Sequence, residues 1–549
     1  MKRIVSFLLV STLSLTMLLT GCGSNKQLDT EQGNSATSDT KSEELSFPLK
    51  KKATLHFVTQ SSPIAPADPN DKLIFKRLEE KTNVHIEWQN IPNTDYGEKK
   101  NLILASNDLP DAFFDAGFSD YEILKYSEEG TIVAVDELVD KYMPNLKGIY
   151  GKYPDYKAFT TAPDGHMYSY PWIEELGSGR ESIHSVDDFP WINKAWLDKL
   201  GLKMPETLTD LENILIQFKE KDPNGNGKKD EIPMTFVNGM GAEDMYFLYG
   251  SFGTGDNWHH MVVGNDKKVI FTANKPEWKE ATKYFHEWFK KGLIDKEAFT
   301  QDYNTMKSRA ANDIFGVFFT WDGENITRGT KIANQFTLMP ALTGPTGKKN
   351  VTRTNNFGLD RGRFVITKVN KNLPLTAKWV DQCYDPAQSV QNNWGTYGEG
   401  SQIFTLKDNG FLQHTDLEKM NVAPVDLRQK TSVAGPLAIL NEYYGKVCTL
   451  PPDAALRLKQ MKEIIAPDMQ AEYNYPRVFF SKEEMDIVGK IYIDKSEIKQ
   501  YIEKKRAEWL LKGGIDEQWD EYVAQLDKLG IKKVFDTFQK AYDRYNGVK

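Results

Sequence analysis

The sequence predicts an α/β fold with two large lobes, or two to three domains. At the start of the folded part, a stretch with strand periodicity is followed by a helical stretch and a second strand-like stretch, an alternation typical of α/β proteins. The chain has 549 residues, which is long for one small domain. Hydrophobic residues make up 40% of it, enough to form a sizeable core.

The first 22 residues have the pattern of a secretory leader that ends in a cysteine. Lys2 and Arg3 form a basic start, and Ile4–Leu19 is apolar but too short to span a bilayer. The segment Leu19–Cys22, Leu-Thr-Gly-Cys, resembles the bacterial lipobox, in which the cysteine is lipidated. An ordinary secretory signal followed by a chance cysteine is the alternative. We expect acyl chains on Cys22 to anchor a soluble body to the outer face of a membrane.

Residues 23–50 are polar and charged with few apolar residues, so we expect a flexible tether that ends shortly before Ala53. The formal net charge is −8, and loss of Lys2 and Arg3 with the leader takes it to −10, which does not favour nucleic acid as a partner. Two cysteines remain, Cys383 and Cys448. Their pairing stays open, and the chain is not a disulfide scaffold.

The first elements of the folded part follow from hydrophobic periodicity. Residues 53–57 alternate apolar and polar, as a strand does. In the stretch Asp71–Lys81 the apolar residues fall on one face of a helix, and residues 84–88 alternate again. Further on, Thr209 and Glu212 predict a capping box at the start of a second helix. Residues 314–321 predict a buried strand, and the chain from Ser481 onward is charged and mostly helical.

A loop with the spacing of cation ligands follows that second helix. Oxygen-bearing side chains stand at its positions one, three, five, nine and ten, with Gly227 at six for a sharp turn. Position twelve is Pro233 instead of the glutamate of an EF-hand. A polar turn without metal is the alternative. The expected calcium ligands are Asp222, Asn224, Asn226, the main chain of Lys228, Asp230 and Glu231.

Twelve tryptophans give the chain a rich supply of flat aromatic surface. Such rings cover the apolar faces of sugars, while polar side chains bind the hydroxyl groups around them. We assign Trp196, Trp278 and Trp288 to packing because they lie in helical patterns. Other tryptophans stand beside Gly, Pro, Asn or Asp, and for these binding and packing remain about equally favoured. The expected ligand-binding residues are Trp172, Trp191, Trp321, Asp322, Arg353, Trp394 and Tyr397.

Motifs of catalysis and nucleotide binding are mostly missing. The glycines at 253 and 255 lack the third glycine of a dinucleotide fingerprint, and residues 344–349 lack the spacing of a P-loop. A pair of catalytic carboxylates stays open, because its separation is a spatial property.

In their order along the chain, several short segments resemble the extracellular solute-binding lipoproteins of ABC transporters in Gram-positive bacteria, especially the branch that imports sugars and oligosaccharides. The loop at Asp222 is similar to the calcium loop of alginate-binding solute receptors, which implies a structural calcium on the six residues named above. The segments are Leu19–Cys22, Ala105–Asp111, Gly130–Leu146, Ala162–Tyr168, Phe189–Asn193, Trp196–Leu202 and Phe299–Asp302.

The resemblance implies a two-lobe, periplasmic-binding-protein-like fold with hinge strands and an interlobe cleft. We expect residues 1–22 as signal peptide, 23–50 as tether, 51–168 plus 358–410 as lobe 1, and 169–357 plus 411–549 as lobe 2 with the calcium loop. The chain should cross between lobes near residues 167–172, 355–363 and 410.

The function implied is capture of a sugar or oligosaccharide, without catalysis, by a lipid-anchored monomer that delivers it to ABC permease subunits. Two alternatives stay open: an anchored polysaccharide-degrading enzyme, and a lipoprotein that presents its ligand to a membrane sensor. The sequence does not identify the sugar.

Overall fold

The computed structural model describes residues 45–106, 108–177, 182–354, 358–399, 401–416, 424–469, 475–492 and 496–547. Cys22 and almost all of the expected tether lie outside these ranges. One compact unit begins at Ser46, close to the expected start of the folded part. None of the helices in the described ranges is long and apolar enough to cross a membrane.

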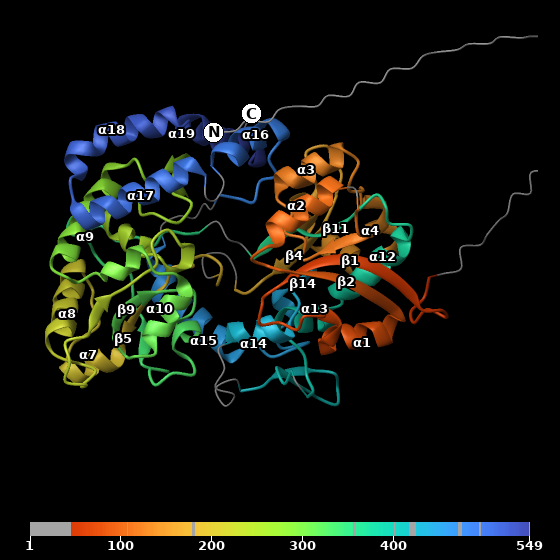
Figure 1. Ribbon diagram of the computed structural model, residues 1–549, viewed down its shortest axis with the longest axis horizontal. Helices are drawn as coiled ribbons and strands as arrows, with labels where there is room; N and C mark the ends of the chain where they lie inside the picture. The colour runs from red at the N-terminus through yellow and green to blue at the C-terminus, as the bar shows by residue number, and fades with distance from the viewer. Residues whose placement is uncertain are drawn as a thin grey trace, which may run out of the picture. The chain divides into compact units, whose positions relative to one another are not determined.

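Two sheets organise this unit (Figure 1). The six-stranded sheet has the order β14-β4-β11-β3-β1-β2, and the four-stranded sheet has the order β10-β5-β9-β6. The first comprises β1 (Ala53–Ser61), β2 (Val84–Pro92), β3 (Ala112–Phe114), β4 (Tyr170–Glu174), β11 (Leu359–Ile366) and β14 (Leu437–Ile439). The second comprises β5 (Pro190–Asn193), β6 (Ile232–Met234), β9 (Phe315–Phe319) and β10 (Phe336–Leu338). Two hairpins complete the strands: β7 (Met261–Val263) with β8 (Val269–Phe271), and β12 (Phe404–Leu406) with β13 (Leu412–His414).

Helices cover both sheets. Those before β5 are α1 (Leu73–Thr82), α2 (Tyr96–Ser106), α3 (Asp120–Glu128), α4 (Asp136–Tyr142), α5 (Pro144–Lys152) and α6 (Pro154–Thr160). Between β5 and β11 lie α7 (Lys194–Leu200), α8 (Leu208–Glu220), α9 (Pro276–Lys290), α10 (Tyr303–Ala310) and α11 (Gly323–Thr327). After β11 come α12 (Leu373–Asp381), α13 (Pro386–Trp394), α14 (Pro424–Thr431), α15 (Pro452–Gln460), α16 (Lys482–Ile491), α17 (Glu497–Lys512), α18 (Ile515–Lys528) and α19 (Ile531–Tyr545).

The predicted strand–helix–strand start is confirmed. β1 and β2 pair in parallel, and α1 connects them. Helix α1 buries Ile74, Phe75 and Leu78, the apolar face that the periodicity indicated, and ends at Asn83 in the left-handed region. The stretch at 314–321 forms β9, whose five residues are all buried, as the prediction required.

The predicted capping box of α8 is wrong by two residues. Thr207 has extended backbone geometry and is the N-cap, and its Oγ1 accepts a hydrogen bond from the amide of Asp210 at 3.0 Å. The Asp210 carboxylate in turn accepts from the amide of Thr207 at 3.0 Å. This pair replaces Thr209 and Glu212 because an aspartate completes the box as well as a glutamate does, and the helix therefore starts at Leu208.

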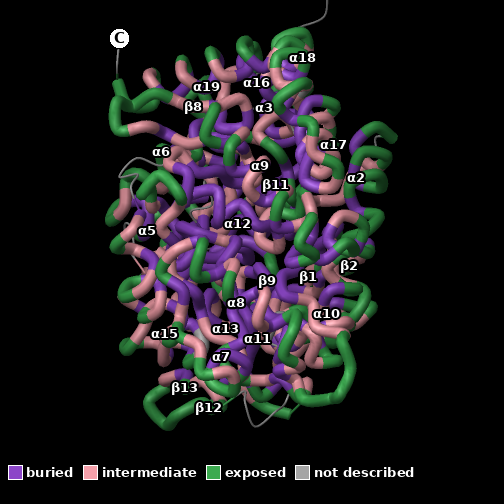
Figure 2. The backbone as a smooth tube through the Cα atoms, turned by 90° about the vertical axis from the view of Figure 1, so that its left-hand side faces the viewer, coloured by how far each residue is buried: buried purple, intermediate pink, exposed green. Residues whose placement is uncertain are grey.

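Each sheet has its own hydrophobic core. In the first lobe, residues such as Val58, Phe113 and Val365 pack with apolar side chains of α2 and α3. In the second, Trp196, Trp278 and Trp288 are at most 2% exposed, which confirms their assignment to packing. The buried backbone forms the inside of the unit, and exposed backbone gathers in outer loops and helix ends (Figure 2).

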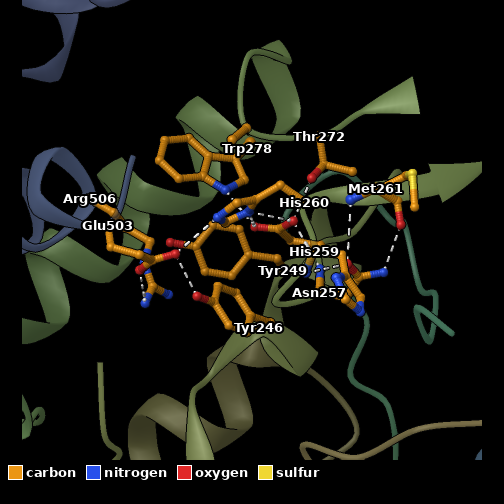
Figure 3. A network of polar contacts seen from close by, with 12 residues as sticks. Tyr246, Tyr249, Asn257, His259, His260, Met261, Thr272, Trp278, Glu503 and Arg506 are labelled. Carbon is orange, nitrogen blue, oxygen red and sulfur yellow. Dashed lines mark hydrogen bonds and ion pairs between the residues drawn. The ribbon is translucent and has the colours of Figure 1, made fainter. Parts of the chain in front are cut away.

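A network of buried charges ties α17 to the second lobe (Figure 3). Arg506 binds Asp244 through its guanidinium, and both side chains are fully buried. Glu503 accepts a hydrogen bond from His260 Nε2 at 2.9 Å, and Asp256 contacts His260 Nδ1 at 3.0 Å. Burial alone would lower the pKa of His260, but Asp256 and Glu503 raise it to about 9. The imidazole is therefore a cation in the folded protein at neutral pH.

The strand pairing bears on two of the three expected crossings between lobes. Strand β4 pairs with β11 and β14 and ends at Glu174, so a first crossing just after it stays near the expected residues 167–172. Strand β14 belongs to the same sheet, so the third crossing follows Ile439 instead of Gly410. Hydrophobic periodicity gave no sign of this, because it does not show which sheet a strand joins. We propose lobe limits that follow the sheets, with β4 and β14 in lobe 1.

Candidate functional site

A cavity that side chains of both lobes line together lies at the ends of the strands. It measures about 630 Å³. β1, β3 and β4 run in the same direction, and residues at or just beyond their carboxyl ends line it. In open α/β sheets, ligands bind outside these strand ends. From the second lobe, the cavity is lined by Trp321 and Asp322, just beyond the end of β9.

Three of the four predicted tryptophans meet in this cavity: Trp172, Trp321 and Trp394. The Trp321 ring stacks on His184, with ring centroids 5.5 Å apart and planes inclined by 23°. The Arg457 guanidinium lies 4.7 Å from the centroid of the same ring and binds Asp322 at 2.8 Å. Aromatic surface from both lobes thus stands next to charged, hydrogen-bonding groups, the composition of a sugar-binding wall.

Trp394 at the end of α13 has a similar setting. The Arg428 guanidinium lies 4.6 Å from the centroid of its ring. Arg428 also donates hydrogen bonds to the main-chain oxygen and the Oδ1 of Asn393, at 3.0 and 2.7 Å. The position of this aromatic ring is therefore held by a side chain of α14, a separate segment of the chain.

Glu174, at the end of β4, lies between the two aromatic settings. Its Oε1 accepts a hydrogen bond from Asn393 Nδ2 at 2.8 Å, and its Oε2 lies 3.6 Å from His184 Nε2. Burial alone would raise the pKa of Glu174, but His184, Arg428 and Asn393 together lower it below its ordinary value. The buried Glu174 carboxylate thus contacts His184, which stacks on Trp321. It also contacts Asn393, which accepts hydrogen bonds from Arg428 beside the Trp394 ring.

A group of charged side chains, Lys72, Asp115 and Arg363, forms the lobe 1 end of the cavity. The Arg363 guanidinium binds Asp115, which follows β3 directly. Burial raises the pKa of Asp115, and Arg363 opposes this shift. Burial lowers the pKa of Lys72 to about 8, and the charge of Asp115 opposes the shift. Lys72 donates a hydrogen bond to the main-chain oxygen of Ser432 at 2.7 Å.

Three expected ligand-binding residues lie away from this cavity. Trp191 is 7% exposed, belongs to the core of the second lobe, and donates from Nε1 to the Thr320 oxygen at 3.0 Å. Arg353 is buried and contacts Ser185. Tyr397 stacks under the Arg77 guanidinium at 3.9 Å. A tryptophan after a proline can lie within a core strand as easily as it can face a cleft, and Trp191 does the former.

Sequence reasoning missed most of the charged residues in the cavity. Asp115 and Glu174 follow or end short apolar runs, so a polar residue at the end of a predicted strand was a usable signal. His184 lies in a connecting segment, and Arg428 and Arg457 lie on helices. For these three, no local pattern indicates that they face a cavity.

The residues of the predicted calcium loop converge between α8 and β6. Asp222 has a φ of 50°, and its carboxylate accepts hydrogen bonds from the amides of Asn226 and Gly227 at 3.1 and 3.0 Å. Asn224 and Asn226 both contact the Asp230 carboxylate. The Glu231 Oε1 atom is buried and has no hydrogen-bond partner among the described residues. Closely spaced oxygens with one unsatisfied carboxylate oxygen fit a hard cation.

No cluster of three or more His, Cys, Asp or Glu side chains in the described ranges has the arrangement of a metal centre. The three carboxylates of the Asp222 loop are therefore not gathered as such a centre in this structure, and two amide oxygens and a main-chain carbonyl are its other candidate donors. Cys383 and Cys448 are both buried and unpaired, which settles the question that the sequence left open.

Known proteins similar to this chain include solute receptors. The model of the family described as bacterial extracellular solute-binding protein matches residues 66–389. The fructooligosaccharide ABC transporter substrate-binding protein FusA of Streptococcus pneumoniae is 51% identical, over 97% of this chain and 96% of that protein.

Two solved structures of FusA superpose with a TM-score of 0.86 each and cover 90% of this chain and all of theirs. One is a complex with kestose, at 52% identity, and the other is an EF-hand mutant with fructo-nystose, at 51%. The alginate-binding protein AlgQ2, at 23% identity and a TM-score of 0.70, shares the fold over 90% of this chain. These matches identify the fold as the two-lobe, periplasmic-binding-protein-like one that the sequence indicated. The chain belongs to the bacterial extracellular solute-binding protein family, as a receptor of the sugar-importing ABC transporter type.

Proposed function

We propose that this protein captures short fructooligosaccharides in the cavity between its two sheets and delivers them to ABC permease subunits. The observation that carries the proposal is the cavity itself, in which three tryptophans stand among hydrogen-bonding side chains at the strand ends. Flat rings can cover the apolar face of a sugar while the carboxylates and guanidiniums bind its hydroxyls. The similarity to FusA over nearly the full chain supports fructooligosaccharides as the sugar class.

The lining charges favour a neutral glycan over an acidic one. Arg457 pairs with Asp322, Arg363 pairs with Asp115, and Arg428 donates to Asn393. A sugar carboxylate would have to compete with these partners for a guanidinium. A neutral sugar can instead add hydrogen bonds to groups that already have their charges balanced.

Calorimetric titration with kestose tests the proposal, with an oligogalacturonate of similar length as the comparison ligand. We expect saturable binding of kestose and much weaker binding of the acidic oligosaccharide. Chromatography of kestose after long incubation tests the enzyme alternative, and unchanged kestose is the expected result. Release of fructose, or absence of binding to any neutral oligosaccharide, would contradict the proposal.

The protein also carries, in this proposal, a structural calcium ion on Asp222, Asn224, Asn226, the Lys228 carbonyl, Asp230 and Glu231. The convergence of these groups and the unsatisfied oxygen of Glu231 support it. Such an ion would neutralise part of the carboxylate charge and fix the loop that joins α8 to β6. None of these residues lines the sugar cavity.

For its cellular location, we propose attachment of the body to the outer face of the cell membrane through lipid on Cys22, with residues 23–50 as the tether. The lipobox-like sequence supports this. Mass spectrometry of the N-terminal peptide from membrane fractions is the direct test. A diacylglyceryl group on Cys22 is expected, and a free N-terminus elsewhere would contradict the anchor. We expect the protein to work as a monomer.

A further inference from the structure

The sugar cavity continues into a small chamber inside lobe 1. This chamber measures about 30 Å³. Five residues line both spaces: Gln60, Ser61, Lys72, Asp115 and Ala434. On its other sides the chamber meets Thr59, Pro66, Pro69, Phe75, Phe114 and Val433. Phe75 and Phe114 belong to the buried core and are 7% and 2% exposed, so the chamber ends against the packed interior of the lobe.

The size of the chamber limits what can enter it. A space of roughly 10–15 Å³ on this measure is needed to hold one water molecule. A chamber of about 30 Å³ therefore accepts a group of one or two heavy atoms, and a sugar ring is far too large. Among the parts of a neutral sugar, an exocyclic hydroxymethyl group has this size.

The polar groups at the entrance suit a hydroxyl. Lys72 Nζ donates to the Ser432 oxygen, its one hydrogen-bond partner among the described residues, although an ammonium has three donors. Asp115 has a φ of 49°, and its Oδ1 pairs with Arg363 while its main-chain oxygen accepts from Gln60 Nε2 at 3.0 Å. No described residue donates a hydrogen bond to its Oδ2. A hydroxyl between Lys72 and Asp115 would find one donor and one acceptor.

We propose that this chamber binds an exocyclic hydroxymethyl group of the sugar unit at one end of the ligand, with Lys72 donating a hydrogen bond to its hydroxyl and Asp115 accepting one from it. The inference rests on the proposed function and deepens it. A terminal pyranosyl pentose, which has no hydroxymethyl group, would leave the chamber unfilled.

Two variants test the chamber by calorimetry with kestose. Lys72→Met removes the ammonium and keeps the stem, and Lys76→Met, at an exposed position of α1, the helix that Lys72 precedes, is its control. Ala434→Leu fills the chamber from an exposed position, and Ala105→Leu, exposed on α2, is its control. We expect both test variants to weaken kestose binding roughly 10- to 100-fold, the loss typical of a hydrogen bond to a charged group. The controls should bind as the unmodified protein does.

Kestose analogues whose terminal fructosyl unit lacks the 1-hydroxyl or the 6-hydroxyl extend the test. The affinity of the unmodified protein for one of these analogues should be as low as the affinity of Lys72→Met for kestose. For that analogue, Lys72→Met should cause no further loss of affinity. Normal kestose binding by both Lys72→Met and Ala434→Leu would overturn this inference but leave the proposed function standing. The same holds if Lys72→Met weakens the binding of kestose and of both analogues equally. Failure of the unmodified protein to bind kestose would overturn the proposed function, and the inference with it.

Discussion

Glu174 Oε1 accepts a hydrogen bond from Asn393 Nδ2 at 2.8 Å, and this contact joins two segments separated by 219 positions in the sequence. Through Asn393 the carboxylate acts on Arg428 and Trp394, and through its other oxygen it acts on His184 and Trp321. A single buried carboxylate therefore influences aromatic rings of both lobes.

We expect Glu174→Leu to weaken kestose binding roughly tenfold, because both rings lose part of their support and a hydrogen bond to a charged group is worth about 1.5–3 kcal/mol. Glu174→Gln keeps an oxygen for Asn393 and should lose less. Calorimetry gives the affinity, and tryptophan fluorescence on ligand addition reports the rings. The exposed Glu129→Gln is the control. Equal affinities in all four proteins would argue against this role.

The tryptophan variants should divide into two classes. Trp172→Ala, Trp321→Ala and Trp394→Ala should each cost about 1–3 kcal/mol of binding free energy, from the aromatic surface a sugar covers, with little loss of fold. Trp191→Ala should instead lower the free energy of unfolding by roughly 3–5 kcal/mol, because its ring fills the core. Titration and chemical denaturation of the same four proteins separate the classes. Normal binding in all three cavity variants would mean that the sugar lies elsewhere.

The calcium loop should respond to chelation. Without the ion, Asp222, Asp230 and Glu231 repel one another within a short turn, so a chelator should lower the melting temperature and added calcium should restore it. Asp222→Ala should abolish that response and leave kestose binding intact, whereas Asp140→Ala, exposed on α4, should keep it. Scanning calorimetry with and without chelator makes the measurement. Metal analysis that finds no calcium, with no effect of chelator, would disprove the site.

The buried pair of Arg506 and Asp244 should matter for stability. Arg506→Met leaves the Asp244 carboxylate buried without its partner, and loss of one member of such a pair costs about 3–5 kcal/mol. Denaturant unfolding should register this change. Lys532→Met, which removes a fully exposed partner of Asp536, should have little effect. Both variants remove a cation that has an acidic partner, but the Arg506 pair is buried and the Lys532 pair is exposed.

His260 gives the same network a pH dependence. Its folded pKa, about 9, lies above its ordinary value of 6.5, so its stabilising contribution is complete below pH 6.5 and is lost as the pH rises through 9. The free energy of unfolding should therefore fall between these values, and His260→Gln should flatten that part of the profile. An unchanged slope in the variant would exclude His260 as its source.

Kestose affinity should fall at alkaline pH through Lys72. The folded pKa of Lys72, about 8, lies below the ordinary 10.5, so the ammonium loses its proton above pH 8, and each further unit should weaken binding up to about tenfold. Asp115 and Arg363 are the charged groups beside it, and the charges of Asp115 and Asp360 raise the pKa of Arg363 despite its burial, so that guanidinium stays a cation in this range. For the free protein the sign is opposite: the unfolded chain binds more protons between pH 8 and 10.5, so this group makes stability rise with pH there. Lys72→Met should remove the alkaline fall in affinity.

Local patterns were sufficient for much of this protein. Residues 53–57, 71–81 and 84–88 have periodicities that depend only on neighbours in the chain, and they form β1, α1 and β2 as predicted. The loop from Asp222 to Glu231 is also local, because its donor groups are close in sequence and a tight turn brings them together. The order of several weak motifs was enough to identify the family.

Sheet membership and the cavity depended on the tertiary structure. The paired residues of β4 and β14 are 265 positions apart, and neither sequence contains a sign of the other. Trp191 and Trp321 both stand beside polar or turn-forming residues, yet one fills a core and the other lines a cavity. Lys72, Asp115 and Glu174 line one cavity only because segments far apart in the chain come together at one edge of the sheet. The sequence determined the elements and the family, since these depend on local spacing, whereas long-range packing decided which side chains face the ligand.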